Sequence, residues 1–262
     1  MAADKEELER ESDYRVPALQ RGLSIVQMFS AGERSLSSNV IAERLGVSVS
    51  AIYRILVTLT DMGYLNKLGT NSYELGPQVL CDGFAYLASR DLVDIAMPHL
   101  NALRDRTSMS CHLGIREHTE VVYLYRAFAA QRLSVNVPIG TRLPCHVTAL
   151  GRVLLSELDE NALAGLYGHV RLDGYPAPAP KTLPELLRMS DEDRARGFVL
   201  HRSDYSTAIA APVRDHSGRI VAAINLSGPD AVMDDETNRQ ALRETLLTSA
   251  TQISRSAGYR TG

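Results

Sequence analysis

The feature that most constrains the fold of this chain is an apolar stripe near its beginning. Its four members recur at spacings of three and four residues, as Ile52, Ile55, Leu56 and Leu59. This spacing places them on one face of a helix, and that face must be buried. The opposite face carries Ser50, Tyr53 and Arg54. The segment therefore predicts a helix with one buried face and one exposed face that can make polar contacts.

The segments around this helix predict a winged helix-turn-helix. A preceding apolar helix ends at Gly46, and Ser48 can cap the next helix by accepting a backbone hydrogen bond. Two helices joined by a tight glycine turn form a helix-turn-helix. Residues 64–67 and 72–75 alternate around a Gly/Asn turn, as in a β-hairpin. Directly after the second helix, such a hairpin is a wing. The alternative is a helical bundle with an attached hairpin.

The residues expected to contact DNA lie on the exposed parts of this arrangement. Serine contacts phosphate or a base edge, and arginine pairs bidentately with guanine in the major groove. Lysine and asparagine in the wing can reach phosphate or the minor groove. The candidates for DNA binding are Arg21, Ser37, Ser48, Ser50, Tyr53, Arg54, Lys67 and Asn71.

Charge and composition agree with a soluble cytoplasmic protein that has a local basic face. The chain of 262 residues carries a formal net charge of −3, yet Arg15 to Gly76 holds six basic and four acidic side chains. No apolar run approaches the roughly 20 residues that a membrane helix needs. Residues 1–14 are polar and acidic, which predicts a disordered tail and no signal peptide. Three widely spaced cysteines favour reduced thiols over a disulfide framework.

Several stretches, in order and at family spacing, resemble the IclR family of bacterial transcriptional regulators. They cover nearly all of residues 15–257 and include VPALQRGLSIVQMF, SSNVIAERLGVSVSAIYRILVTLTDMGYL, RLPCHVTALGRVLLSEL and AIAAPVRDHSGRIVAAINLSGP. The resemblance implies an α+β protein. A winged helix-turn-helix at 15–76 is joined by a linker helix at 77–91 to a GAF-like effector-binding domain at 92–258. It also implies a homodimer or homotetramer on double-stranded operator DNA.

The chain departs from the family pattern at three places. Val49, Ser50 and Ala51 stand where the family commonly has Lys-Ser-Thr, and Glu74 stands where Arg is frequent. These changes predict weaker or altered DNA contacts. The loop at 204–207 is about three residues shorter than in the family. Because that loop helps to wall the effector pocket, the identity of the ligand does not transfer from a relative.

The second half alternates strands and helices as a sensor domain does. We expect helices at 92–106, 148–158, 161–167 and 182–196, and strands at 110–115, 121–127, 133–137, 198–202, 207–214 and 219–226. Residues 215–218 suit a hairpin turn, and 174–180, with three prolines, suits a loop. The linker helix carries exposed apolar side chains, which favours packing against a second copy of the chain.

An effector site is expected where a helix start meets a strand end. The helix after Thr148 begins with free backbone N–H groups that can hold a carboxylate, with small or apolar residues leaving room. Asn225 and Ser227 point the same way along a strand. By resemblance, both match the family's effector-binding pair, and the ligand class implied is a small organic acid or aromatic catabolite. The candidates for effector binding are Leu143, Cys145, Ala149, Leu150, Asp204, Ala208, Asn225 and Ser227. The alternative is that Asn225 and Ser227 only satisfy backbone groups.

The sequence offers little support for a metal site, a cofactor or an enzyme. The pairs Cys111-His112 and Cys145-His146 lack the spacing of a metal site, and we expect no metal and no cofactor. No nucleophile elbow, phosphate loop or dinucleotide fingerprint is present, so an enzyme is not expected. A protein-binding scaffold with an empty sensor domain is the remaining alternative.

The expected mechanism has two states, in which the ligand changes DNA affinity through the linker helix. The sequence does not decide the operator, the effector, or repression against activation.

Overall fold

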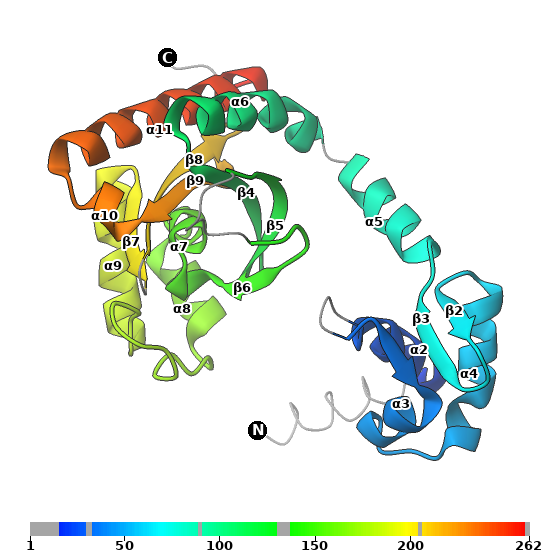
Figure 1. Cartoon of the computed structure of the whole chain (residues 1–262). Coiled ribbons are helices and arrows are strands. Elements are labelled where there is room, and N and C mark those ends of the chain that lie inside the picture. The colour runs from blue at the N-terminus through cyan, green and yellow to red at the C-terminus, as the bar shows by residue number, and fades with distance from the viewer. Residues whose placement is uncertain (1–15, 30–32, 89–90, 130–136, 204–205, 260–262) are drawn as a thin grey trace. The chain divides into compact units, whose positions relative to one another are not determined.

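The computed structural model describes residues 16–29, 33–88, 91–129, 137–203 and 206–259. The chain divides into two compact units, Met1–Ser89 and Arg90–Gly262. Figure 1 shows the helices and strands of both units. The predicted acidic tail at 1–14 lies outside the described residues. Among the residues that are described, none of the helices combines the length and apolarity needed to cross a membrane.

The first unit is a winged helix-turn-helix followed by a further helix, as expected. Its elements in chain order are α2 (Pro17–Gln27), β1 (Ser35–Ser37), α3 (Ser38–Arg44), α4 (Val49–Asp61), β2 (Leu65–Leu68), β3 (Ser72–Leu75) and α5 (Gln78–Ala88). Ser37 caps α3 by accepting from the N–H of Val40, and Ser48 caps α4 by accepting from Ala51. The glycine turn between these helices contains Gly46 at φ +65°, a left-handed conformation that suits glycine.

The apolar stripe of α4 forms the core of this unit. Ile52 and Leu56 are fully buried, and Ile55 and Leu59 pack at the edge of the same cluster. Ile25 from α2 and Ile41 from α3 complete the interior. At roughly 1.5–3 kcal/mol for each large apolar side chain removed from water, this cluster is the main source of stability of so small a unit.

The wing has one strand more than the sequence predicted. β1 pairs antiparallel with β3, placing Leu36 opposite Tyr73, so the sheet order is β1-β3-β2. β1 spans three residues, Ser35–Ser37, too few to show a period. Its pairing joins the wing to the start of α3 and fixes where that helix begins.

The linker helix α5 is tied to the wing at one close approach. The N–H of Gly76 donates to the carbonyl of Tyr64, and the N–H of Gln78 donates to that of Gly63. A Cβ atom at Gly76 would lie 2.1 Å from the carbonyl oxygen of Gly63, so only glycine fits there. Farther along α5, Asp82 accepts hydrogen bonds from Tyr64 and Gln78. The direction in which α5 leaves the wing is therefore fixed.

The second unit is built on one six-stranded antiparallel sheet of order β6-β5-β4-β9-β8-β7. Its strands are β4 (Ser110–Glu117), β5 (Glu120–Ala127), β6 (Arg142–Pro144), β7 (Val199–Ser203), β8 (Ser206–Arg214) and β9 (Ile220–Pro229). Its helices are α6 (Asp91–Thr107), the 3-10 turn η1 (Cys145–Val147), α7 (Ala149–Leu155), α8 (Glu160–Tyr167), α9 (Leu183–Arg196), α10 (Asp230–Met233) and α11 (Glu236–Ser256).

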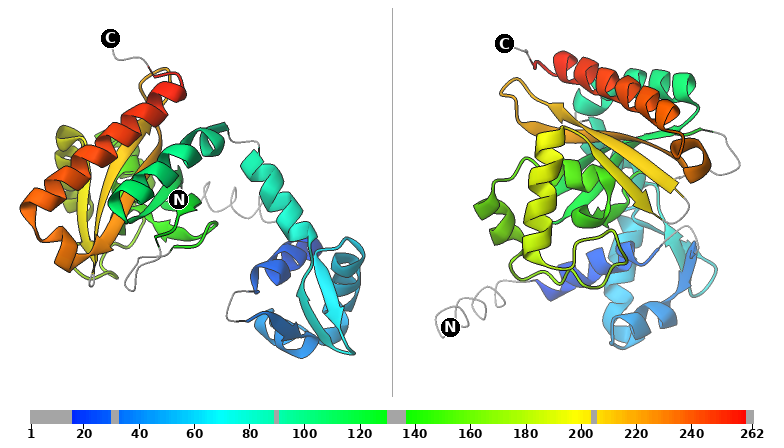
Figure 2. Two further views of the ribbon diagram at one scale, coloured as in Figure 1. Left: turned by 45° about the horizontal axis from the view of Figure 1, so that its top comes forward. Right: turned by 90° about the vertical axis from the view of Figure 1, so that its left-hand side faces the viewer.

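Helices cover both faces of this sheet. α6 and α11 lie side by side over one face, and α7 and α9 lie over the other (Figure 2). Leu150 and Val153 of α7 pack with Val199, Ala210 and Ala223 of the sheet in the main core. The expected α+β architecture is confirmed, with the hairpin between β8 and β9 at the predicted turn.

A buried ion pair fastens α7 to α9. The guanidinium of Arg152 donates to both carboxylate oxygens of Asp193, at 2.8 Å each. The two residues are only 8% and 2% exposed. A bidentate pair of this kind compensates for the removal of both charges from water, and it fixes how the helices meet.

Several expected boundaries differ from the structure. The helix after Thr148 ends at Leu155 and not at Leu158. The strand expected at 133–137 falls almost wholly outside the described residues, whereas a short strand, β6, was not expected. Cys145 and His146 lie in the 3-10 turn η1, which was not expected.

Candidate DNA-binding surface and effector cleft

The outer face of α4 is polar and accessible. Ser50, Tyr53 and Arg54 are all exposed, and Tyr53 retains 58% of its surface. The Ser48 hydroxyl caps α4 and lies 2.9 Å from that of Ser50. The start of the helix therefore offers hydroxyls and the positive end of a helix dipole, which suits a phosphate group.

The other predicted DNA-contact residues divide into exposed and engaged groups. Lys67 is exposed on β2. Asn71 is exposed in the hairpin turn, where its side chain accepts from the Ser38 hydroxyl and its carbonyl from the Ser38 N–H. Ser37 is half-buried and its oxygen is used in capping α3. Arg21 is half-buried on α2, where it lines a groove between α2 and α4.

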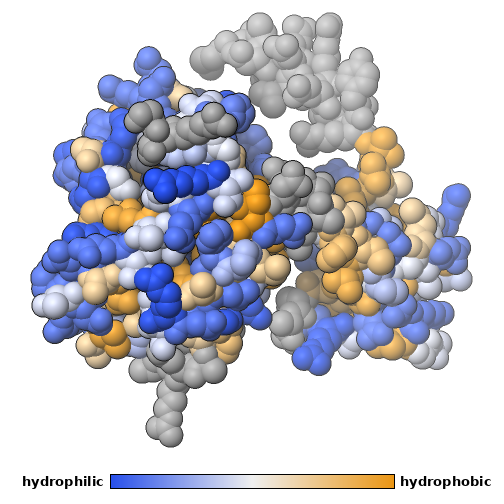
Figure 3. All heavy atoms as spheres, turned by 90° about the horizontal axis from the view of Figure 1, so that it is seen from above, coloured by the Kyte–Doolittle hydropathy of each residue, from blue (hydrophilic) through white to orange (hydrophobic). Residues whose placement is uncertain are grey.

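A groove of about 650 Å³ runs between α2 and α4. It is apolar, with Leu19, Leu23 and Met62 among its walls, and Arg21 and Arg54 are its charged members. Apolar side chains are also exposed on α5, where Leu80 and Phe84 are 75% and 67% accessible. Orange apolar atoms are visible on the surface of this part of the chain in Figure 3.

The second unit contains a cleft of about 850 Å³ at one end of β7. The proline-containing loop from Tyr175 to Ala179 forms one wall together with Val147. His201, Ser203 and Asp230 lie on the sheet side. The sequence predicted the loop as a loop but gave no sign that it walls a cleft.

Three polar side chains near this cleft are buried with unpartnered atoms: both ring nitrogens of His146, which packs on Tyr175, and one atom each of His201 and Ser227. Neither Nδ1 of His201 nor Oγ of Ser227 has a hydrogen-bond partner, and the residues are 9% and 3% exposed. The strand register aligns them: His201 is opposite Ala208, and Ala208 is opposite Ser227. Directly opposed residues in antiparallel strands point to the same face. Burial lowers the pKa of His201 to about 4, with a further contribution from Arg152, so its imidazole is neutral near pH 7.

The predicted pair Asn225 and Ser227 lies on the same face of β9, but Asn225 is partly engaged. Its Oδ1 accepts from the backbone N–H of His112 at 3.2 Å and lies 3.0 Å from Nδ1 of the same residue. Burial lowers the pKa of His112 to about 4. The oxygen of Asn225 thus joins β4 to β9, whereas the hydroxyl of Ser227 does not have such a partner.

Most of the remaining effector candidates belong to the core. Cys145, Ala149 and Leu150 are fully or nearly fully buried in the main cluster, and Leu143 packs against it. η1 packs closely on the start of α7, where a Cβ at Gly151 would lie 2.2 Å from Cα of Cys145. Ala208 is half-buried on the cleft-side face. Asp204 lies outside the described residues.

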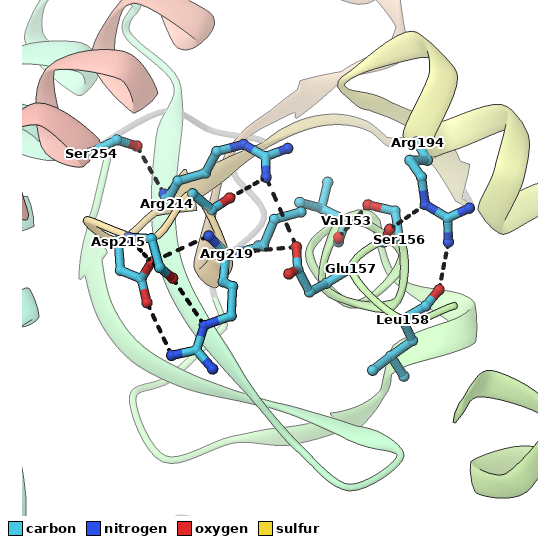
Figure 4. A network of polar contacts seen from close by, with 12 residues as sticks. Val153, Ser156, Glu157, Leu158, Arg194, Arg214, Asp215, Arg219 and Ser254 are labelled. Carbon is cyan, nitrogen blue, oxygen red and sulfur yellow. Dashed lines mark hydrogen bonds and ion pairs between the residues drawn. The ribbon is translucent and has the colours of Figure 1, made fainter. Parts of the chain in front are cut away.

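A smaller cavity of about 190 Å³ lies at the other end of the same strands, and its polar groups are engaged (Figure 4). Arg194 donates to the carbonyl oxygens of Ser156 and Leu158, just beyond the end of α7. The carboxylate of Glu157 accepts from the N–H of Ile220, and Arg214 donates to the carbonyl of Gly218. These contacts join the end of α7 to the sheet and to α9, so we assign the polar groups around this cavity a structural role.

The histidine and cysteine pairs do not assemble into a metal site. His112 packs edge-on against Tyr123, whereas His146 lies between Tyr167 and Tyr175. Among the described residues, no group of three or more His, Cys, Asp or Glu side chains is placed to hold a metal ion.

The three cysteines should differ sharply in reactivity. Burial raises the pKa of both Cys111 and Cys145 to about 12, whereas Cys81 is exposed on α5. Because the thiolate is the reactive form, we expect one fast thiol per native chain with a chromogenic disulfide at pH 8, and three after unfolding. A Cys81→Ser variant should lose the fast phase. A second fast thiol in the native protein would contradict the described burial.

Comparison with known proteins identifies the chain. Its residues 18–69 match the model of the IclR helix-turn-helix domain, and residues 84–255 match that of the bacterial transcriptional regulator IclR C-terminal domain. The chain belongs to the IclR family of bacterial transcriptional regulators. This IclR-family protein is therefore a DNA-binding regulator with a C-terminal effector-binding domain.

Three relatives show the extent of the similarity. The p-hydroxybenzoate hydroxylase transcriptional activator of Acinetobacter baylyi is 32% identical over 82% of either chain. The crystal structure of a transcriptional regulator, RHA06195, from Rhodococcus sp. RHA1 is 29% identical, with a TM-score of 0.82 over 93% of this chain and 98% of that one. An IclR homologue from Microbacterium hydrocarbonoxydans complexed with 4-hydroxybenzoate shares the fold at 20% identity, with a TM-score of 0.79 over 92% and 98%.

Proposed function

We propose that this regulator binds its operator through α4 and the wing and senses a small organic acid in the cleft beside β7. The exposed polar face of α4 supports the first part, since its hydroxyls and Arg54 match the chemistry of phosphates and guanine edges. The buried, unpartnered polar atoms of His201 and Ser227 support the second. The protein acts in the cytoplasm as a regulator and not as an enzyme, without a cofactor.

The observation that carries the effector assignment is the combination of cleft and unpartnered groups. Burying a polar group without a partner costs about 1–3 kcal/mol, so two such groups facing one side of a sheet are expected to serve a ligand. The Acinetobacter relative is named for p-hydroxybenzoate hydroxylase, and the Microbacterium homologue was crystallised with 4-hydroxybenzoate. An aromatic acid is therefore the first ligand class to test.

The partner of the apolar groove on the first unit is a second copy of this chain. Leu19, Leu23 and Met62 on the groove, and Leu80 and Phe84 on α5, form exposed apolar surface that a lone chain would leave in water. A symmetric dimer also places two recognition helices for the two halves of a palindromic operator.

Introducing charge on this apolar surface should break the oligomer. We expect Leu23→Glu combined with Phe84→Glu to sediment as a monomer at concentrations where the parent is a dimer or tetramer. Ile139→Glu, which changes an exposed apolar side chain of the second unit, serves as the control. A double variant that keeps the parent's sedimentation coefficient would contradict this interface.

Effector and operator binding are coupled through α5 in this proposal. Titrating 4-hydroxybenzoate into the protein with and without saturating operator tests the coupling, because each ligand must change the affinity for the other by the same factor. The proposal expects a difference of about 5- to 150-fold between the two titrations. Identical affinities would show that the acid does not control DNA binding.

A further inference from the structure

Three strands bring a polar row beside the effector cleft, and His201 is the member of the row that lines it. His201 of β7, Ala208 of β8 and Ser227 of β9 occupy one cross-strand register. Opposed Cβ atoms lie about 5 Å apart, so the Cβ atoms of His201 and Ser227 are separated by roughly 10 Å. The methyl group of Ala208 is all that the chain places between them in the row. This spacing leaves room for a group the size of a carboxylate.

Burial is incomplete at the middle of the row, although Ala208 packs against the edge of the main core. Ala208 is half-buried, although Ala210, two residues farther along the same face of β8, is completely buried. His201 itself lines the cleft. At the two ends of the row, Nδ1 of the buried His201 and Oγ of the buried Ser227 have no hydrogen-bond partner. The row therefore has a partly accessible centre and unsatisfied polar ends.

The cleft does not offer an anion a ready positive charge. Arg202 is the arginine on its wall, and it is ion-paired with Asp230 at 3.3 Å and with Asp234 at 3.2 Å. Arg152, on α7 over the same face of the sheet, is held by Asp193 of α9, which also lies 3.7 Å from Arg196. A carboxylate above Ala208 would thus be placed among paired charges, and uncompensated burial of a charge is costly.

We propose that an acidic effector binds over Ala208, between the imidazole of His201 and the hydroxyl of Ser227, and that His201 takes up one proton as the acid binds. Ser227 donates its hydroxyl hydrogen to one carboxylate oxygen, and the protonated imidazole donates to the other. The proton comes from solvent and neutralises the charge of the acid in the cleft. This inference rests on the proposed function, because it concerns the same effector.

Proton uptake makes effector binding depend on pH, with a definite sign. The free imidazole has a pKa of about 4 and is neutral at pH 6 to 8. An adjacent carboxylate favours the charged imidazole and raises that pKa in the complex. Between the free and the bound pKa, affinity rises as pH falls, by up to about tenfold per pH unit for one proton. His146, whose pKa is also lowered by burial, is the other histidine near this wall, packed against Tyr167 and Tyr175.

Calorimetric titration of the full chain with 4-hydroxybenzoate at pH 6, 7 and 8 tests the inference. At each pH, two buffers of different ionisation enthalpy give the number of protons taken up. We expect net proton uptake and an affinity that rises as pH falls, by up to about tenfold per unit where uptake approaches one proton. The amide analogue, 4-hydroxybenzamide, should bind without proton uptake because it carries no charge to neutralise.

Three variants separate the row from its surroundings. His201→Gln keeps a hydrogen-bonding side chain that does not titrate, and its binding of 4-hydroxybenzoate should be weak and independent of pH. His216→Gln changes an exposed histidine in the β8–β9 turn and should behave as the parent. Ala208→Leu fills the centre of the row and should abolish binding without changing a titratable group. Unfolding temperatures near that of the parent show that the variants are folded.

Each outcome is decisive. Binding of the acid without proton uptake, or an unchanged pH slope in His201→Gln, would overturn the inference and leave the proposed function standing. Tight binding to Ala208→Leu would place the ligand elsewhere and also overturn it. If 4-hydroxybenzoate and benzoate both fail to bind the parent at millimolar concentration, the inference and the proposed ligand class fail together. Operator binding, measured separately, is unaffected by any of these outcomes.

Discussion

Replacing Arg54 by alanine should weaken operator binding by about 1–3 kcal/mol, which is roughly 5- to 150-fold in the dissociation constant. Arg54 is exposed on α4, and its neighbours along the helix, Ser50 and Tyr53, are exposed with it. A guanidinium that donates two hydrogen bonds to a guanine loses both when it is truncated. The measurement is an anisotropy titration of labelled operator at fixed salt, since salt alone changes such affinities greatly.

Arg188→Ala is the matched control for this experiment. Arg188 is exposed on α9 of the second unit, so its removal changes the net charge equally without touching α4. We expect its operator affinity to stay within about twofold of the parent, because a distant surface charge contributes little at physiological salt. If Arg54→Ala and Arg188→Ala bound the operator equally well, α4 would not be the element that reads DNA.

Replacing Asp193 by alanine should be the most destabilising single change in the second unit. The variant leaves the guanidinium of Arg152 buried without its bidentate partner. Breaking a buried pair from one side costs about 3–5 kcal/mol, far more than the net contribution of the intact pair. Calorimetric unfolding should show a transition of the second unit that moves down by several degrees, while that of the first unit does not move.

Two further variants distinguish the buried charge from a general effect of altering α9. Asp191 on the same helix pairs with Arg194 at the surface, so Asp191→Ala should cost less than about 1 kcal/mol. Replacing both members of the buried pair, as Arg152→Met with Asp193→Leu, should recover much of the loss. An Asp193→Ala protein as stable as Asp191→Ala would show that Arg152 finds another partner or reaches water.

The first unit was largely predictable because its signals are local. The stripe of α4, the capping residues Ser37 and Ser48, and the turn at Gly46 each act within a few residues. The missed element, β1, is defined by its pairing with β3, some 37 residues away. Three residues carry no detectable period, so only the tertiary pairing shows that Ser35–Ser37 is a strand.

The effector region was predictable only in part, because it depends on contacts between distant strands. Alternation along β9 correctly placed Asn225 and Ser227 on one face. His201 could not be joined to them from the sequence, because its place beside them follows from the β7–β8–β9 register. The close packing of η1 on the start of α7, and the burial of Ala149 and Leu150, also follow from contacts that no local pattern reveals.

Operator recognition can be tested by letting the full chain select bound duplexes from a random DNA pool. The selected site is then titrated by anisotropy at two salt concentrations. We expect an enriched, partly palindromic site, because a symmetric oligomer reads two half-sites, and an affinity that falls steeply as salt rises. Absence of enrichment by well-folded protein at low salt would contradict operator recognition by this chain. The departures at Val49, Ala51 and Glu74 would then be the first residues to revert.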